Sequence, residues 1–285
     1  MKSMRKHLLG VSLVALLFVV GCKPPQQFGG VPRTKNYRAI ISLSPSTSEL
    51  TSQFTIPIVG RTKADNFPTT LSAVTVVADL KPDYEAITRL HPDLIILDTE
   101  LYGDAEIKKL EGITEVWKYG PKSFDEYIKA LYELGNKVGN ESGVNEYINK
   151  VQRQKSTAEG DTPPKIFKSV MIIPDAGGHH MISGTKSFQN NMMKIMGTEP
   201  TGPDSDKFET LNPEFLTAQD PDLIIFAGEP KQFLADSRFA NLKAIKNHSY
   251  FGLDQDVALR KGARVDTFIY EGHRNLMLLF AEKGK

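Results

Sequence analysis

The sequence predicts an α/β protein made of two small lobes, each with a mostly parallel sheet flanked by helices, joined by a single long helix. The first observation behind this prediction is a repeated phrase, because Pro-Asp-Leu-Ile-Ile occurs at 92–96 and again at 221–225. In each copy a glutamate, Glu85 or Glu214, precedes the proline at the same distance. The second observation is the stretch 123–158 between the copies, which has no strand pattern. A unit repeated once on either side of a helical stretch indicates two similarly built lobes.

The first lobe is predicted to cover 38–139. In its copy of the repeat, Lys81-Pro82-Asp83 suits a helix start, and the helix dipole favours Glu85 in the first turn. Pro92 cannot continue the helix. The apolar Leu-Ile-Ile that follows is typical of an interior strand of a parallel sheet. Strands are expected at 38–43, 56–61, 74–78, 93–97 and 112–119.

The stretch after the fifth strand is predicted to be helical. Apolar residues recur at helical spacing through 123–158, with an interruption at Gly139-Asn140. The second segment, 140–160, is charged and long, and we interpret it as the helix that bridges the lobes. The second lobe then covers 161–285. It is expected to contain a strand at 169–173, the second copy of the repeat, and helices at 187–196 and 266–281.

The N-terminus has the features of a bacterial export signal. Basic residues precede an apolar run, 8–20, that is too short to span a membrane comfortably, and small residues lead to Cys22. We therefore expect 1–22 to be a lipoprotein signal peptide in which Cys22 becomes the lipidated first residue. An uncleaved transmembrane anchor is the alternative. Residues 23–37, rich in Pro, Gln and Gly, are predicted to be a flexible tether.

Composition limits the partners and the compartment. Cys22 is the only cysteine, so a lipidated chain has no thiol left, which suits an extracytoplasmic compartment. The 35 basic and 34 acidic residues give a formal charge of +1, and no basic block is present. Nucleic acid is therefore not expected as a partner. We expect a monomer, tethered to the membrane by its lipid and exposed to the extracytoplasmic or periplasmic side.

Several segments, taken together in their order, resemble one protein family. They are Arg38-Ala-Ile-Ile-Ser-Leu-Ser-Pro-Ser-Thr-Ser-Glu49, Val59-Gly60, both copies of the repeat, Ser183-Gly184 and Leu242-Lys-Ala-Ile-Lys246. They are similar to the extracytoplasmic solute-binding proteins of ABC importers for cobalamin, ferric siderophores and haem, over almost the whole mature chain. The resemblance implies two α/β lobes joined by one helix, with no catalysis and no resident cofactor. It also implies capture of a metal chelate between the lobes and its delivery to an ABC permease.

In this family one glutamate on each lobe docks onto arginines of the permease, and Glu85 and Glu214 match those positions. The alternative is that a glutamate simply suits the first turn of a helix, which contributes a few tenths to about 1 kcal/mol. The bridging helix is stiffer than a pair of extended strands. We therefore expect only a small hinge motion between the lobes.

The ligand is expected between the lobes, at loops that follow the carboxyl ends of strands. Cobalamin-binding members of the family line this region with aromatic residues, and Phe67 and Phe208 match two of these positions. Asp79 and Met181 stand where other aromatic residues are expected, which puts cobalamin in doubt. The residues expected to contact ligand are Ser44, Pro45, Phe67, Tyr102, His179, His180, Met181, Phe208 and Arg264.

Some of these side chains have two interpretations. His179 and His180 follow two glycines, so an imidazole could reach the iron or cobalt of a chelate, or simply be solvated. Tyr102 could supply a phenolate or merely pack. Arg264 could meet a carboxylate or phosphate, or hold the structure together. No site for a bare metal ion is expected, because too few histidines and carboxylates converge.

Two other functions are compatible with parts of the sequence. Ser44 follows a strand and precedes a helix, as the nucleophile of an α/β-hydrolase does, which suggests a lipid-anchored enzyme. The Gly-x-Ser-x-Gly elbow of that fold is absent, since the sequence reads Ser-Leu-Ser-Pro-Ser. The third possibility is a sensor that binds the ligand without a transporter. Only the pair Glu85 and Glu214 argues against it.

Overall fold

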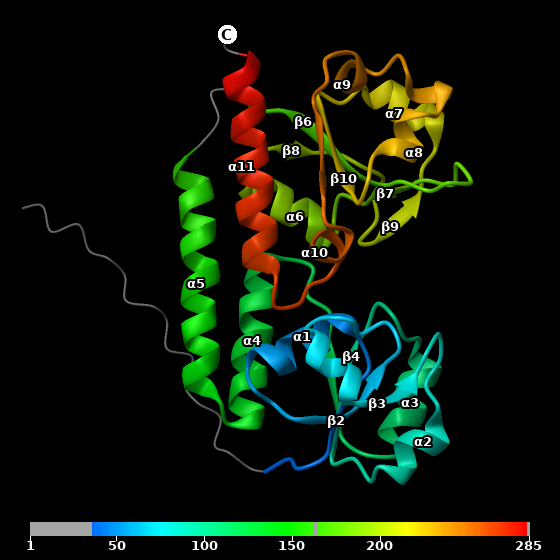
Figure 1. Cartoon of the computed structure of the whole chain (residues 1–285), viewed down its shortest axis with the longest axis vertical. Coiled ribbons are helices and arrows are strands. Elements are labelled where there is room, and N and C mark those ends of the chain that lie inside the picture. The colour runs from blue at the N-terminus through cyan, green and yellow to red at the C-terminus, as the bar shows by residue number, and fades with distance from the viewer. Residues whose placement is uncertain (1–35, 162–164, 284–285) are drawn as a thin grey trace, which may run out of the picture. The chain divides into compact units, whose positions relative to one another are not determined.

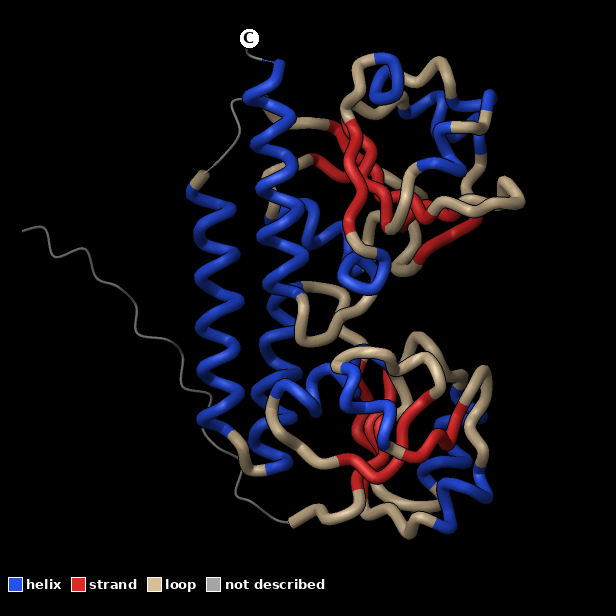
Figure 2. The backbone as a smooth tube through the Cα atoms, viewed as in Figure 1, coloured by secondary structure: helices blue, strands red, loops and turns tan. Residues whose placement is uncertain are grey.

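The computed structural model describes residues 36–161 and 165–283, and these contain two sheets with helices packed along them (Figure 1). Figure 2 shows one sheet in each lobe, with long helices along one side of both. The predicted signal peptide 1–22, its Cys22 and nearly all of the tether 23–37 lie outside the described residues. Of the helices in the described part, none is both long and apolar enough to cross a membrane.

The first sheet contains five parallel strands in the order β3-β2-β1-β4-β5. They are β1 (Ile40–Ser42), β2 (Ile58–Thr62), β3 (Thr75–Ala78), β4 (Leu94–Asp98) and β5 (Val116–Tyr119). The connecting helices are α1 (Pro45–Gln53), η1 (Thr69–Ala73), α2 (Tyr84–Arg89) and α3 (Asp104–Glu111). All five residues of β4 are buried, as expected for an interior strand covered on both faces.

Alternate residues of β1 and β4 enter two different cores. Ile40 and Ile96 belong to a cluster that continues into the long helices, whereas Ile41 and Ile95 pack with α2 and α3 residues on the opposite face. This alternation is the period of two of a β-strand, applied to a sheet with both faces covered.

The aspartate of the repeated phrase has the same structural role in both copies. Asp93 accepts hydrogen bonds from the backbone N–H groups of Arg38 and Ala39, at 2.6 and 3.0 Å, just before β1. Asp222 likewise accepts from the N–H of Lys168, at 3.3 Å, at the start of β6. Each Pro-Asp pair therefore ends a helix and aligns its strand with the first strand of the same lobe.

Two antiparallel helices, α4 (Phe124–Val138) and α5 (Glu141–Gly160), follow the first sheet. Gly139 adopts a left-handed conformation with φ of 70°, which ends α4 and lets the chain reverse. Asn140 then caps α5 and donates from its amide to the carbonyl of Phe54, at 2.7 Å. This bond fixes the beginning of α5 to the first lobe.

The second sheet has the order β11-β10-β6-β7-β9, with β8 paired to β6. The strands are β6 (Lys168–Ile173), β7 (Met181–Ser183), β8 (Glu199–Pro200), β9 (Phe208–Thr210), β10 (Leu223–Ala227) and β11 (Tyr250–Leu253). The helices are α6 (Phe188–Ile195), α7 (Pro213–Gln219), α8 (Lys231–Leu234), η2 (Ser237–Phe239), α9 (Lys243–Lys246), α10 (Gln255–Leu259) and α11 (Val265–Lys283). The sequence did not predict β7 and β9, which pair antiparallel, because three residues are too few to show a period.

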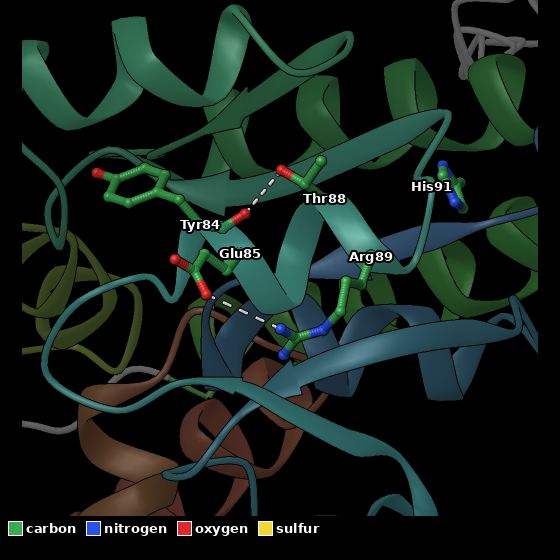
Figure 3. Close-up of a pocket in the computed structure, with 5 residues that line it drawn as sticks. All are labelled: Tyr84, Glu85, Thr88, Arg89 and His91. Carbon is green, nitrogen blue, oxygen red and sulfur yellow. Dashed lines mark hydrogen bonds and ion pairs between the residues drawn. The ribbon is translucent and has the colours of Figure 1, made fainter.

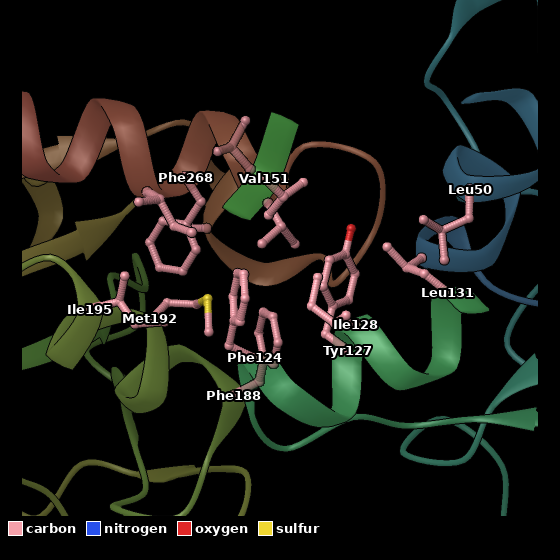
Figure 4. Packing of buried hydrophobic residues seen from close by; sticks show 14 of the residues in the cluster. Leu50, Phe124, Tyr127, Ile128, Leu131, Val151, Phe188, Met192, Ile195 and Phe268 are labelled. Atoms are coloured by element: carbon pink, nitrogen blue, oxygen red, sulfur yellow. The ribbon is translucent and has the colours of Figure 1, made fainter. Parts of the chain in front are cut away.

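One hydrophobic cluster reaches both lobes through the helices. Figure 4 shows Leu50 of α1 and Leu131 of α4 at one end, with Met192 of α6 and Phe268 of α11 at the other. Helix α5 packs against both α4 and α11. The two lobes are therefore coupled by a shared core as well as by the chain itself.

Candidate functional site

The loops after β1 and β4 meet where the strand order of the first sheet reverses. Because β1 and β4 are parallel neighbours, Ser44 and Asp98 lie at the same carboxyl edge. Open α/β sheets bind ligands at such a reversal point. This edge is therefore the first candidate for a binding surface.

Ser44 and Pro45 begin α1 at this edge. Ser44 is fully buried, and its hydroxyl oxygen accepts from the N–H of Thr47 at 3.1 Å, which caps the helix. Pro45 occupies the first helical position, where its missing N–H costs nothing. A buried capping hydroxyl lacks the exposure that a hydrolase nucleophile needs.

A short segment of the second lobe, residues 260–264 between α10 and α11, contacts this edge through charged side chains. The guanidinium groups of Arg260 and Arg264 pair with the carboxylate of Glu49, at 3.1 and 2.6 Å. The Glu49 side chain is completely buried. Burial alone would lower the pKa of Arg264, but the hydrogen bond and charge of Glu49 raise it above the usual value. Both arginines are therefore engaged inside the protein.

Lys261 of the same segment is buried against two acidic residues of the first lobe. Its Nζ lies 2.9 Å from an oxygen of Glu100 and 3.6 Å from one of Asp98. Burial raises the pKa of Asp98, and the charge of Lys261 opposes this effect. For Glu100, Lys261 and Lys122 outweigh burial and lower the pKa. Lys261 and Asp98 are buried and Glu100 is partly exposed, so this group forms a second, partly buried set of ion pairs between the lobes.

The backbone of 260–264 is bound to the first lobe as well. The carbonyl oxygens of Lys261 and Gly262 accept from the hydroxyls of Tyr119 and Tyr127, the second at 2.8 Å. The Lys261 N–H donates to Ser46 Oγ at 3.2 Å. A Cβ on Gly262 would lie 2.9 Å from the Cδ of Glu49, so only glycine fits here. This segment belongs to the second lobe in the chain but is held by the first.

The loop after β2 forms a further contact across the lobes. The guanidinium of Arg264 stacks over the ring of Phe67, 4.4 Å from its centroid, as in a cation–π pair. The neighbouring Asn66 donates to Asp256 at 3.0 Å and accepts from Arg260 at 2.7 Å. Phe67 remains 43% exposed, so part of its ring is available to a ligand.

The two adjacent histidines have different surroundings. His179 is exposed on its loop, whereas the His180 side chain is 1% exposed and its ring packs against Phe233 and Phe239. Its Nδ1 accepts from the N–H of Asp175 at 2.9 Å. Burial lowers the pKa of His180 despite the nearby carboxylate of Asp236. The surroundings of His180 are those of a neutral core histidine, so only His179 is placed to meet a ligand.

The other residues expected to contact ligand also differ in burial. Tyr102 lies in the core of the first lobe, where burial, followed by the charge of Asp65, raises its pKa. Met181 and Phe208 occupy the antiparallel pair β7 and β9, and Met181 is 36% exposed. Tyr102 is placed to pack rather than to bind, whereas Met181 lies at an accessible edge.

Glu85 and Glu214 occupy equivalent places in their lobes. Asp83 caps α2 by accepting from the N–H of Ala86 at 2.9 Å, and Asn212 caps α7 by accepting from Phe215 at 3.1 Å. Each glutamate follows its cap in the first turn and is exposed. The repeat therefore presents one carboxylate on the surface of each lobe.

Glu85 also lines a shallow pocket of about 600 Å³ on the surface of α2 (Figure 3). Its carboxylate lies 3.9 Å from Nη1 of Arg89, and its side chain is 90% exposed. This pocket is on the helix and not at the carboxyl-edge loops, so it suits a partner's side chain better than a chelate. The residues that line it are Tyr84, Glu85, Thr88, Arg89 and His91.

Sequence reasoning overlooked Glu49, Asp98 and Glu100 as parts of the contact between the lobes. Their partners are more than 150 positions away in the chain, so no local pattern could reveal them. Two features of the sequence could have suggested this contact. They are the basic residues in 260–264 and the glutamate that ends the motif at 38–49. Within 36–161 and 165–283, no three His, Cys, Asp or Glu residues are grouped as a metal site.

The chain matches a known protein family and a bacterial relative. Residues 40–257 match a protein family described as periplasmic binding protein. An uncharacterized ABC transporter substrate-binding lipoprotein of Bacillus subtilis, YvrC, is 25% identical over 246 residues, which cover 81% of this chain and 77% of that protein.

Two solved structures are similar in fold. The periplasmic haem-binding protein BhuT has a TM-score of 0.75 at 16% identity, covering 86% of this chain and 100% of that chain. The periplasmic vitamin B12 binding protein BtuF of Vibrio cholerae has a TM-score of 0.74 at 18% identity, covering 85% and 98%. These likenesses confirm the predicted fold class.

Proposed function

Since the chain belongs to the periplasmic binding protein family, we propose that it is a lipid-anchored substrate-binding protein of an ABC importer. It captures a metal chelate between its lobes and delivers it to the permease. The lipid anchor is Cys22, and the protein faces the extracytoplasmic side. The name of the relative YvrC, a substrate-binding lipoprotein, supports the anchor and the importer.

The observation that carries this proposal is the meeting of the two carboxyl edges. Glu49 of α1 and Glu100 of the loop after β4 pair with Arg260 and Lys261 of the second lobe. Asn66 of the loop after β2 donates a hydrogen bond to Asp256 of the second lobe. A ligand bound beside these contacts would touch both lobes. The binding of ligand and the relative position of the lobes would therefore be linked.

The similar proteins support the proposed ligand class. BhuT is described as binding haem and BtuF as binding vitamin B12, both of which are metal chelates. In this chain Phe67, His179 and Met181 are the exposed members of the predicted contact set, and Phe208 is partly buried against the main hydrophobic cluster. Ser44, Tyr102 and His180 are buried, Pro45 is partly buried, and Arg264 is bound to Glu49.

Glu85 and Glu214 are the proposed contacts to the permease. Both are exposed, both lie in the first turn of a capped helix, and there is one on each lobe. Two carboxylates at fixed positions on separate lobes let cationic groups of a partner recognise how the lobes are placed. The pocket around Glu85 gives one such group a place to dock.

Ligand capture is tested by retained colour. The purified mature chain is mixed in turn with cyanocobalamin, haem and a ferric siderophore, and unbound ligand is removed by gel filtration. We expect one chelate to elute with the protein at about one equivalent and with a shifted absorption spectrum. Elution of every chelate apart from the protein would contradict the proposal. Nonspecific binding would retain all three chelates, at more than one equivalent of chelate per protein.

A further inference from the structure

The cations at the carboxyl edges are largely neutralised by the protein's own carboxylates. Arg260 and Arg264 share Glu49, and the buried Lys261 lies between Asp98 and Glu100. To bind an anionic ligand, these cations would have to leave buried partners. Breaking a buried ion pair leaves a desolvated charge without its partner, so an anionic ligand gains little from these cations.

The more exposed cations of the same edges also have acidic neighbours. Lys63 Nζ lies 2.9 Å from Asp79, and Lys122 Nζ lies 3.0 Å from Asp206. Acidic residues outnumber Lys and Arg, 11 to 8, in the carboxyl-edge loops taken together, which are 63–68, 79–83, 98–103, 120–122, 174–180, 204–207, 228–231 and 254–264. The remaining lysines of these loops are exposed, and each stands within two positions of an acidic residue; they are Lys81, Lys207 and Lys231. The edges therefore offer no concentrated positive charge.

Exposed apolar side chains occur at the same edge of the first sheet. The strands β2, β3 and β4 are each followed by a loop with an exposed apolar residue: Phe67, 43% exposed, Leu80, 94% exposed, and Leu101, 56% exposed. Because these strands are parallel, the three loops lie on one edge. These three side chains place apolar groups within reach of a ligand at this edge. Met181 supplies a counterpart in the second lobe.

We propose that this surface selects metal chelates that carry no net negative charge and present apolar groups. The inference rests on the proposed function and narrows its ligand class. A neutral chelate can contact Phe67, Leu80 and Leu101 without disturbing any ion pair. A chelate with several negative charges would instead face acidic loops whose arginines are already engaged.

The test compares two ferric siderophores of different charge. Quenching of protein fluorescence is titrated with ferrichrome, a neutral trihydroxamate, and with ferric enterobactin, a tricatecholate with three negative charges; cyanocobalamin serves as a second neutral chelate. We expect at least one neutral chelate to bind about 100-fold more tightly than the tricatecholate. Equal or tighter binding of the tricatecholate overturns the inference and leaves the proposed function intact. Binding of haem, whose two carboxylates make it anionic, with neither neutral chelate bound also overturns the inference. Binding of none of the four overturns the proposed function itself.

A surface variant separates the charge effect from the shape of the ligand. Asp79→Asn releases the exposed Lys63 beside Leu80 without touching the core. Glu133→Gln on α4, which releases Lys129, makes the same change of charge far along the chain and is the control. We expect Asp79→Asn to tighten binding of the anionic chelate about threefold to tenfold, with the neutral chelate and the control variant unchanged. Equal effects of both variants, or no effect of Asp79→Asn, would overturn the inference.

Discussion

His179 and His180 are neighbours in the sequence, yet the structure exposes one and buries the other. The sequence could identify the pair as interesting because two glycines precede it, but not which ring turns inward. That is decided by Phe233 and Phe239, which lie more than fifty positions later and close over the His180 ring. The same applies to Glu49, a charged residue in an otherwise exposed-looking motif. Its burial is explained only by arginines from the other lobe.

The buried His180 predicts a pH dependence of stability. Burial lowers its pKa from the usual 6.5, so the unfolded chain binds a proton more readily than the folded chain. The stability that neutral His180 contributes is therefore fully present above about pH 6.5. It is lost as the pH falls through the lower pKa of His180 in the folded state. The carboxylate of Asp236 stays charged in this range, because the hydrogen bond from Arg238 lowers its pKa to about 2.

The measurement is urea unfolding of the wild type and of His180→Asn between about pH 5 and 7.5. The asparagine oxygen can still accept from Asp175 but does not titrate. We expect the difference in unfolding free energy between the two proteins to shift in favour of the variant as the pH falls. A difference that does not change with pH would show that His180 is not held neutral.

At the scale of elements, the repeat was the most informative feature of the sequence. Helix caps, a helix-ending proline and an apolar strand are local signals, and they suffice to predict β4, β10 and the glutamates in front of them. The segment 260–264 could not be predicted, because its conformation depends on Tyr119, Tyr127 and Glu49 of the other lobe. A short segment whose partners are all distant carries no periodic pattern of its own.

Gly262 gives a direct test of this segment. A methyl group there would press on the buried carboxylate of Glu49, which two arginines hold in place. We expect Gly262→Ala to lower the unfolding free energy by about 1–3 kcal/mol, the usual cost of overpacking. Gly160→Ala at the end of α5 is the control, since a Cβ there would meet no atom within 4 Å. Equal stability of the two variants in urea would contradict the described packing.

Among the contacts that couple the lobes in residues 36–161 and 165–283, two are extensive. One is the hydrophobic cluster that runs from α1 through the long helices to α6 and α11, and the other is the bound segment 260–264. The sequence predicted stiffness from the bridging helix alone. The shared core and the buried ion pairs are additional reasons, and they depend on packing between residues far apart in the chain.

This coupling predicts a small change of shape when ligand binds. The radius of gyration from X-ray scattering should differ by less than about 1 Å between the ligand-free and ligand-bound protein. Charge neutralisation of both Lys261 partners, Asp98→Asn with Glu100→Gln, removes one of the two ion-pair groups between the lobes and should increase the difference. A large change in the wild type would mean that the described contacts open during binding.

The central claim is that a partner recognises this receptor through one carboxylate on each lobe. The most direct measurement is uptake of the captured chelate by cells that carry the wild type or Glu85→Lys with Glu214→Lys. The control is Glu133→Lys with Glu146→Lys, two exposed positions on α4 and α5. We expect the docking variant to bind ligand normally in solution while uptake falls at least about tenfold, and the control to take up ligand like the wild type. Unchanged uptake by the docking variant would contradict the account.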